Sequence, residues 1–305
     1  MQYPTISEYV KANQDASDNL DMSTEATNAE LLKEAITDEF GVEYSKDGRK
    51  LLKAPQKLDG TYSIKEGVRI ICNNAFSGCF SLKSLVIPDS VTRIGEGAFL
   101  WCSSLSEIVI PSSVTSIGHS AFYKCDSLRV VISDGVTSIW DSAFGGCDSL
   151  SEIVIPSSVT SIGDSAFGGC VSLSEIVIPS SVTSIGDHAF GGCRSLSEIV
   201  IPSSVTSIGK GAFNGCSSLI DIVIPNSVTS IGKDAFYGCR SLSEIVIPSS
   251  VTSIGDSAFY GCRSLSEIVI PSSITSIGDK AFQFCNFPND LKQELISQFG
   301  EKIFG

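Results

Sequence analysis

The sequence predicts a solenoid of about ten stacked repeats, with a short parallel strand in each repeat, turns or short 3₁₀ segments on the opposite side, and helical caps at both ends. The phrase SLSEIVIPSSVTSIGDSAFGGC, residues 149–170, recurs with few changes. Cysteines also recur every 23 residues, with one step of 22, at positions 79, 102, 125, 147, 170, 193, 216, 239, 262 and 285. Units of this length bury their apolar side only against their neighbours, so the repeats share one continuous core.

The first half of each repeat predicts one short strand. In the segment EIVI that begins at Glu152, Ile153 and Ile155 point toward the core. Glu152 and Val154 then point outward, and this alternation is typical of a half-exposed strand. Pro156 follows directly, and it ends the hydrogen-bonded ladder because proline has no N–H group.

The second half of each repeat predicts turns. Gly163 marks a tight turn, and the segment DSAF after it predicts a helical turn or 3₁₀ segment with Asp164 near its N-terminus. The serines and threonines of SSVTSIG are expected to form local hydrogen bonds in turns and at strand edges. A hydroxyl array that matches a glycan or another ordered surface is the alternative for them. Stacked strands lie ~4.8 Å apart, so ten coils make a body on the order of 45 Å long.

The full pattern of the repeat, L-x-x-I-x-I-P-x-x-V-x-x-I-G-x-x-A-F-x-x-C, resembles the BspA-type leucine-rich repeat family over about residues 61–285. The resemblance is specific because proline, glycine, Ala-Phe and cysteine recur in register with the aliphatic residues. It implies a right-handed leucine-rich-repeat solenoid of 23-residue repeats with a parallel sheet on its concave side. It also implies a lead-in hairpin over residues 44–55, with Asp47 and Gly48 in its turn.

Two repeats depart from this pattern. The first, YSIKEGVRIICNNAF, is imperfect and has Cys72 where later repeats have glycine. The repeat after Cys125 is one residue shorter, so that Leu128 precedes Val130 by two positions instead of three, and Trp140 replaces its turn glycine. We expect a local bulge or kink in that repeat.

The repeat boundaries divide the chain into an N-terminal helical cap and hairpin (1–57), the solenoid (58–285) and a C-terminal helical cap (286–305). Caps are expected because the ends of a solenoid expose core and open strand edges. The alternative for the N-terminal helices is an independent recognition or dimerisation piece.

Three helices are predicted in these caps. A short one runs from Thr5 to about Ala12. A second lies in TNAELLKEAITDEFG, with Thr27 and Glu30 in capping-box spacing, a stop at Gly41, and one apolar side made of Leu31, Leu32, Ala35, Ile36 and Phe40. The C-terminal helix begins at Asn289 and has one apolar side made of Leu291, Leu295, Ile296 and Phe299.

The chain is acidic, with a formal net charge of −13. Such a surface repels phosphate backbones, so nucleic acid is not expected as a partner. No apolar run reaches the ~20 residues that span a bilayer, which argues against membrane insertion. The start of the chain lacks the basic and apolar regions of a signal peptide. The resemblance implies a cell-surface or secreted protein, whereas a cytoplasmic protein follows if Met1 is the native start.

Neither catalysis nor a cofactor is expected. The histidines, His119 and His188, are 69 residues apart and lie in separate repeats. No nucleophile, metalloprotease, phosphate-binding or dinucleotide-binding motif occurs in a usable context. The repeated acids are equivalent to one another, which disfavours the separate acid and base roles that catalysis needs.

The cysteine column is expected to consist of buried thiols that act as small hydrophobic residues. Disulfides between neighbouring repeats are an alternative, but side chains in parallel register point the same way rather than at each other. Metal binding is a weaker alternative, since no C-x-x-C pair or Cys/His cluster occurs.

The outward side chains of the strands form two columns along the predicted sheet. The polar column contains Ser84, Glu107, Arg129, Glu152, Glu175, Glu198, Asp221, Glu244 and Glu267. The apolar column contains Val86, Val109, Val131, Val154, Val177, Val200, Val223, Val246 and Val269. Adjacent carboxylates in water repel each other by roughly 1 kcal/mol per pair, and Arg129 is expected to relieve part of that repulsion.

Three roles for these columns stay open. The acids confer solubility, or they select a basic protein partner while the valines supply apolar contact, or they bridge calcium. No D-x-D-x-D-G loop is present to wrap calcium, so no metal site is expected. The residues expected to bind a partner are Glu107, Val109, Glu152, Val154, Glu175, Val177, Glu198, Val200, Asp221, Val223, Glu244, Val246, Glu267 and Val269.

The resemblance implies a binding role, because members similar to this chain are surface proteins that attach to host matrix proteins and other cells. We therefore expect a non-catalytic protein-binding scaffold that acts in adhesion or in host or cell-surface interaction. A structural or self-associating rod, or an intracellular protein-interaction module, is the alternative. The chain is expected to be a monomer or to self-associate weakly.

Overall fold

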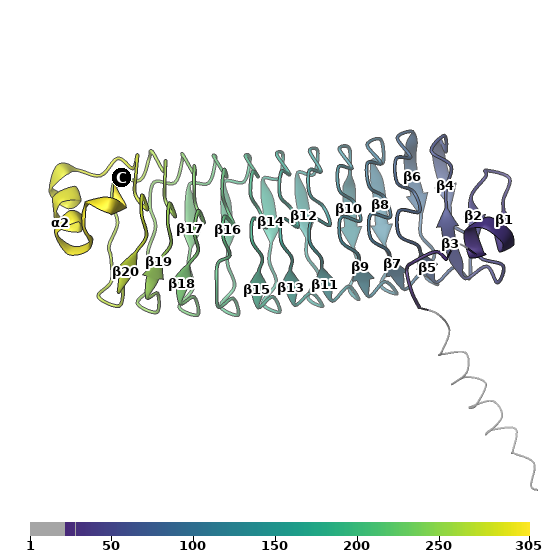
Figure 1. The fold of residues 1–305 in the computed structure, drawn as a ribbon, viewed down its shortest axis with the longest axis horizontal. Coiled ribbons are helices and arrows are strands. Elements are labelled where there is room, and N and C mark those ends of the chain that lie inside the picture. The colour runs from purple at the N-terminus through teal and green to yellow at the C-terminus, as the bar shows by residue number, and fades with distance from the viewer. Residues whose placement is uncertain (1–21, 28) are drawn as a thin grey trace, which may run out of the picture.

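The computed structural model describes residues 22–27 and 29–305. Figure 1 shows a long row of stacked coils, with the N-terminal strands at one end and helix α2 (Asn289–Phe299) at the other. The predicted solenoid is therefore confirmed. The helix predicted from Thr5 to about Ala12 lies outside the described residues.

The EIV segments, or their equivalents in the first repeats, form parallel strands that we call the EIV strands. Neighbouring strands are in register, so that Glu152 lies beside Glu175. Four of them form one sheet, two pairs follow, and single bridges join Val223 to Val246 and Val246 to Val269. The EIV strands are β4 (Gly60–Ser63), β6 (Leu82–Val86), β8 (Glu107–Ile110), β10 (Arg129–Ile132), β12 (Glu152–Val154), β14 (Glu175–Val177), β16 (Glu198–Val200) and β17 (Asp221–Val223).

Most coils also contain a second strand, so the expectation of one strand per repeat is wrong. Two-residue Ser-Ile segments pair in parallel with the same segment of the next coil, and with the N-terminal strands they form a nine-stranded and a three-stranded sheet joined by bridges through Ile208. Two residues are too short to show alternation, and it is the neighbouring coils that make them a strand. These strands are β1 (Ile36–Thr37), β2 (Glu43–Tyr44), β3 (Lys50–Lys53), β5 (Ile70–Ile71), β7 (Arg93–Ile94), β9 (Ser116–Ile117), β11 (Ser138–Ile139), β13 (Ser161–Ile162), β15 (Ser184–Ile185), β18 (Ser230–Ile231), β19 (Ser253–Ile254) and β20 (Ser276–Ile277).

The turn side of each coil is a chain of β-turns. In one repeat the Ala166 N–H donates to the Gly163 carbonyl at 3.3 Å. Ser165 has a φ of 53°, and this left-handed conformation interrupts any helix. The backbone bonds instead to the next coil, where the Phe167 N–H donates to the Ala189 carbonyl at 2.8 Å. The predicted turns are therefore present, but the described repeats contain no 3₁₀ segment.

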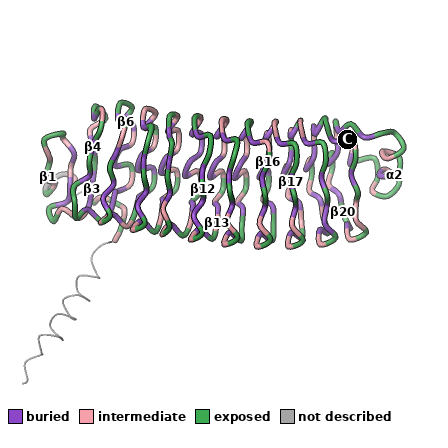
Figure 2. The backbone as a smooth tube through the Cα atoms, turned by 180° about the vertical axis from the view of Figure 1, so that it is seen from behind, coloured by how far each residue is buried: buried purple, intermediate pink, exposed green. Residues whose placement is uncertain are grey.

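The core consists of columns of like side chains, and Figure 2 shows buried and exposed stretches alternating within the coils. The largest column is a stack of phenylalanines whose neighbouring ring centres lie 4.9–5.7 Å apart. All are fully buried, so each ring packs mainly on the rings of the coils before and after it. The stack contains Phe76, Phe99, Phe122, Phe144, Phe167, Phe190, Phe213, Phe236, Phe259 and Phe282.

The repeat cysteines are buried thiols, as predicted, and form no disulfide within the described residues. From Cys102 to Cys285, each Sγ–H donates to the phenylalanine carbonyl of the preceding coil at 3.1–3.2 Å. Burial disfavours the thiolate, and it raises the pKa of Cys170 and Cys285 to about 12.

The N-terminal cap over the described residues is built from strands, and the long helix predicted from Thr27 is wrong. The capping box itself forms, because the Thr27 N–H donates to Glu30 Oε2 at 2.7 Å and the Glu30 N–H to Thr27 Oγ1 at 3.2 Å. The helix is only the five-residue π-helical turn η1 (Glu30–Glu34), and Ala35 is extended. Strand β1 follows and pairs antiparallel with β2; both of its residues are β-branched, which favours a strand.

The hairpin after β1 is present as the resemblance implies. Strands β2 and β3 pair antiparallel, with Asp47 and Gly48 in the turn between them. Gly48 has a φ of 72°, where a side chain would strain the backbone, and Ser45 Oγ donates to Asp47 Oδ1 at 2.6 Å. Strand β3 then pairs in parallel with β5, which joins the cap to the first coil.

The C-terminal cap contains the predicted helix. In α2, Leu295 is buried, and Leu291 and Phe299 are partly buried against the core. The chain then forms the 3₁₀ turn η2 (Glu301–Ile303), where the Ile303 carbonyl accepts the Phe282 N–H at 2.9 Å. The end of the chain thus replaces the missing next coil.

The shortened repeat does not have the predicted bulge in its EIV strand. Strand β10 pairs with β8 in unbroken register, Arg129 beside Glu107. Its other side has no ladder to β12, whereas the second strands β9, β11 and β13 pair without interruption. The missing residue is therefore absorbed by the chain before β10. A ladder is also absent between β14 and β16, in repeats of full length, so the interruption beside β10 is not specific to the shortened repeat.

Replacing Phe167 by alanine should lower the free energy of unfolding by about 3–5 kcal/mol, because the cavity breaks the ring stack between two coils. Urea denaturation followed by circular dichroism measures this loss. The matched control is Val177→Ala on the exposed strand face, which should change the free energy by less than about 0.5 kcal/mol. Equal losses in the two variants would contradict the ring stack as a main source of stability.

Stability should fall steeply at alkaline pH. The ordinary thiol pKa is 9.0, and burial raises the pKa of Cys79 to about 11 and those of Cys170 and Cys285 to about 12. Between these values the unfolded chain releases thiol protons that the folded chain retains. The free energy of unfolding therefore falls by about 1.4 kcal/mol per pH unit for each buried cysteine as the pH rises above 9. This loss is absent below pH 9.

Urea denaturation between pH 8 and pH 12 under reducing conditions checks this slope. A variant with Cys170→Ala and Cys193→Ala should lose stability less steeply than the wild type above pH 9, by about 1.4 kcal/mol per pH unit for each cysteine removed. Both proteins contain the same tyrosines and lysines, so the difference isolates the thiols. If the free energy of unfolding fell with the same slope in both proteins above pH 9, the cysteines would ionise as readily in the folded state as in the unfolded state.

Candidate functional site

The outward side chains of the EIV strands lie on one surface, which we call the EIV face. It comprises the polar column from Ser84 to Glu267 and the valine column from Val86 to Val269. All seven acids predicted to bind a partner are exposed. The valines are also exposed, from 51% for Val109 to 79% for Val269. The fourteen residues predicted from the sequence therefore lie together on one accessible face.

Parallel register brings like residues side by side on this face. Glu152 lies beside Glu175, and Glu198 beside Asp221. The pairing follows from the strict repeat, since every coil presents the same outward residue at the same height. Beyond the last regular EIV strand, the bridge between Val246 and Val269 continues the alignment.

The acids on this face lack basic partners. The ion pairs between described residues are Lys50–Glu30, His119–Asp141, Lys124–Asp148 and Lys302–Asp279. None of them involves the EIV face. Arg129 lies beside Glu107 in the strand register but forms no ion pair with Glu107 or Glu152 in the described chain, so its relief of the repulsion stays a prediction.

Two hollows interrupt the EIV face, and the sequence patterns do not reveal either. The larger, of 610 Å³, surrounds Arg129 in the shortened repeat and is lined by Ser106, Glu107, Ser127, Leu150 and Glu152 among others. The second, of 510 Å³, is lined by Asp221, Val223, Pro225, Asn226, Glu244 and Val246 among others. The missing residue before Val130 is the only sequence signal for the first hollow.

Exposed aromatic residues on the turn side are a further feature that the repeat pattern hides. Trp101 and Phe284 have φ values of 62° and 65° at a position where most repeats have glycine, and they are 45% and 58% exposed. Each meets a tyrosine of a neighbouring coil edge-on, Trp101 with Tyr123 and Phe284 with Tyr260. Their signal in the sequence is the replacement of glycine two positions after the core phenylalanine.

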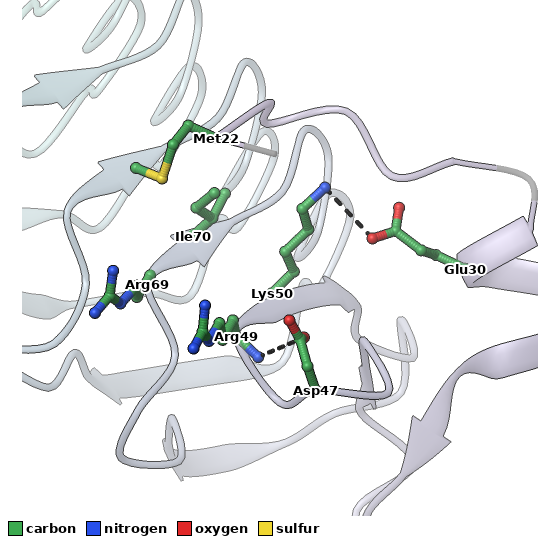
Figure 3. A pocket seen from close by; sticks show the side chains of 7 residues that line it. All are labelled: Met22, Glu30, Asp47, Arg49, Lys50, Arg69 and Ile70. Atoms are coloured by element: carbon green, nitrogen blue, oxygen red, sulfur yellow. Dashed lines mark hydrogen bonds and ion pairs between the residues drawn. The ribbon is translucent and has the colours of Figure 1, made fainter. Parts of the chain in front are cut away.

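A small cavity of 110 Å³ lies beside the N-terminal cap. Figure 3 shows Arg49 and Arg69 side by side on its wall, and Lys50 directed at Glu30. The Lys50–Glu30 ion pair spans 3.3 Å and ties the turn η1 to β3. With Met22 and Ile70 also on the wall, this cavity belongs to the packing between the cap and the first coils.

The described residues contain no group of three or more histidine, cysteine or acidic side chains that could hold a metal ion. The two histidines lie in different surroundings. His119 contacts Asp141 at 3.3 Å and the ring of Trp140, whereas His188 lies over Gly211 on the turn side. No helix in the described part of the chain has the length and apolarity needed to cross a bilayer.

The solenoid resembles several solved leucine-rich-repeat structures. A leucine-rich repeat protein of T. pallidum is 37% identical over 65% of this chain and 84% of that chain, with a TM-score of 0.54. A leucine-rich repeat protein of Bacteroides ovatus is 27% identical over 89% of both chains, with a TM-score of 0.55. The pneumococcal vaccine antigen PcpA, at 21% identity over 84% of this chain and 74% of that one, shares the fold with a TM-score of 0.53.

A comparison with curated proteins finds no match. The model of the BspA type leucine rich repeat region matches six copies, over residues 69–197 and 183–305. These ranges cover most of the chain and all but the first of the described coils. Together with the repeat pattern and the stacked parallel strands, they show that this chain belongs to the BspA-type leucine-rich repeat family.

Proposed function

We propose that this protein is a non-catalytic protein-binding scaffold whose EIV face contacts a partner with basic and apolar groups. The observation that carries the proposal is the column of nine exposed valines next to a column of acids that form no ion pair with any residue the structure describes. Contiguous exposed apolar surface with a polar border is typical of interaction sites. Adhesion to a host matrix or cell-surface protein is the setting that the family resemblance implies.

The fold does not require valine on this face. The exposed position of the second strands carries a polar residue, as in Ser184 of β15, which still pairs in register with Ser161 of β13. Threonine and valine favour strands similarly, so threonine would serve the EIV strands as well. Strand formation therefore does not explain the exposed valines, and their presence supports a contact surface. Many similar weak contacts along the solenoid would combine to give a useful affinity.

The alternative of a self-associating rod has less support. End-to-end growth requires open strand edges and an exposed core at the ends of the solenoid. At the described N-terminal end, Tyr62 covers the stack at Phe76, with ring centres 6.2 Å apart. At the other end, Phe287 covers Phe282 at 5.5 Å. Covered ends favour a discrete body that offers its sides to a partner.

The test of this function is binding of the wild type and a charge-reversed variant to immobilised matrix and cell-surface proteins, measured by surface plasmon resonance. Glu175→Lys, Glu198→Lys and Glu244→Lys together should reduce binding to basic partners at least tenfold, because attraction becomes repulsion. The matched control carries Glu66→Lys, Asp89→Lys and Asp134→Lys, which change the net charge equally at exposed sites off the face. Unchanged binding by the first variant, or equal loss in the control, would remove the EIV face as the binding site.

The acid column should also cost stability. Replacing Glu175 and Glu198 by glutamine should raise the free energy of unfolding by about 0.5–1 kcal/mol at low ionic strength, because it removes carboxylate repulsion between adjacent coils. The gain should vanish near 1 M salt, where the Debye length is about 3 Å. Urea denaturation at two salt concentrations measures it, with Asp89→Asn as the off-face control. Equal stability at low salt would show that the acids do not repel one another measurably.

A further inference from the structure

The repeat with one residue fewer marks one coil of the EIV face as different from the rest. The polar column from Glu107 to Glu267 contains seven acids and one base, Arg129. Strand pairing places Arg129 directly beside Glu107. The side chain is exposed and, in the described part of the chain, has no ion pair. Its charge is thus available to a partner.

The largest of the hollows described above lies at the same coil. It has a volume of 610 Å³, and Arg129 lies between Glu107 and Glu152 on its wall. Ser127 also lines it, and Ser106 on the same wall donates its hydroxyl to the Lys83 carbonyl at 3.1 Å. A carboxylate that enters here meets the Arg129 guanidinium and the Ser127 hydroxyl, while cations on either side of it meet the two glutamates.

Identical coils create a problem of register for any partner. A repetitive partner that shifts along the face by one coil finds the same acid and valine again, so several positions have nearly equal affinity. A single oppositely charged site removes this degeneracy, because a cation opposite Arg129 is repelled and an anion is attracted. Arg129 is the only basic residue in the polar column from Glu107 to Glu267.

The spacing of the coils favours a helical partner. The rings of the phenylalanine stack are 4.9–5.7 Å apart, which gives the distance from one coil to the next at the level of the core. An α-helix presents one side chain per turn at intervals of about 5.4 Å. A helix laid along the solenoid therefore presents one side chain to each coil, with a basic stripe over the acids and an apolar stripe over the valines.

We propose that the hollow at Arg129 accepts one carboxylate from a basic amphipathic helix that lies along the EIV face, and thereby fixes the register of the partner. This inference rests on the proposed function and adds to it the shape of the partner and the position of one acid. Arg129 acts as a specificity residue, and the acids and valines of the other coils supply the remaining contacts.

The test uses three synthetic helical peptides of eight turns, about 29 residues long, one turn for each coil from Glu107 to Glu267. One has lysine in every turn beside a leucine stripe. The other two have glutamate in place of lysine in the second or the seventh turn, which covers both directions of binding. Fluorescence anisotropy measures the affinity of each peptide for wild type, Arg129→Glu, and Arg69→Glu, a control with the same charge change directly before strand β5, away from the EIV face.

One glutamate peptide should bind the wild type about tenfold tighter than the all-lysine peptide, and Arg129→Glu should reverse this preference. Arg69→Glu should leave the preference unchanged. Equal affinities for all three peptides would overturn the role of Arg129 while leaving the acid and valine columns as a binding face. No binding by any peptide would overturn the helical partner, and the protein panel described above decides the proposed function independently.

Discussion

Each coil of this protein depends on its neighbours for its backbone hydrogen bonds. Directly before the second strands, the Thr183 N–H donates backward to the Thr160 carbonyl at 2.9 Å, and on the turn side the Phe167 N–H donates forward to the Ala189 carbonyl at 2.8 Å. A single repeat lacks partners for these groups and has only half of a core. The fold is therefore stable only as an array.

This dependence explains why so many polar residues recur along with the core. Ser181 Oγ donates to the Val159 carbonyl at 2.6 Å, and Asp164 Oδ1 accepts the N–H of Asp187 at 2.7 Å. The buried cysteines bond to the phenylalanine carbonyls in the same manner. These columns are needed to satisfy backbone groups between coils. Among the described residues, the outward side chains of the EIV strands form no such hydrogen bonds, and this is why the proposed contact surface is assigned to them.

The regular stacking of the coils is interrupted at both ends of the solenoid and at its one shortened repeat. At the C-terminus the Ile303 carbonyl replaces the missing coil as the acceptor for Phe282. At the N-terminus the hairpin of β2 and β3 changes antiparallel pairing into the parallel pairing of the coils. In the middle, the shortened repeat keeps its second strand paired, while its EIV strand β10 has no ladder to β12. A hollow lies at this coil, and another lies between the full-length coils of Asp221 and Glu244.

The sequence by itself determined the period, the core columns, the EIV strands, the C-terminal helix and the exposure of the acid and valine columns, because strict repetition places like residues at like heights. It did not reveal the second strands, which are two residues long and exist through pairing with other coils. It also predicted a long helix after Thr27, since the capping box and apolar spacing are real local signals. Only the tertiary structure decided that this segment pairs with β2 as a strand, and that the shortened repeat forms a hollow around Arg129, because both outcomes depend on neighbours distant in sequence.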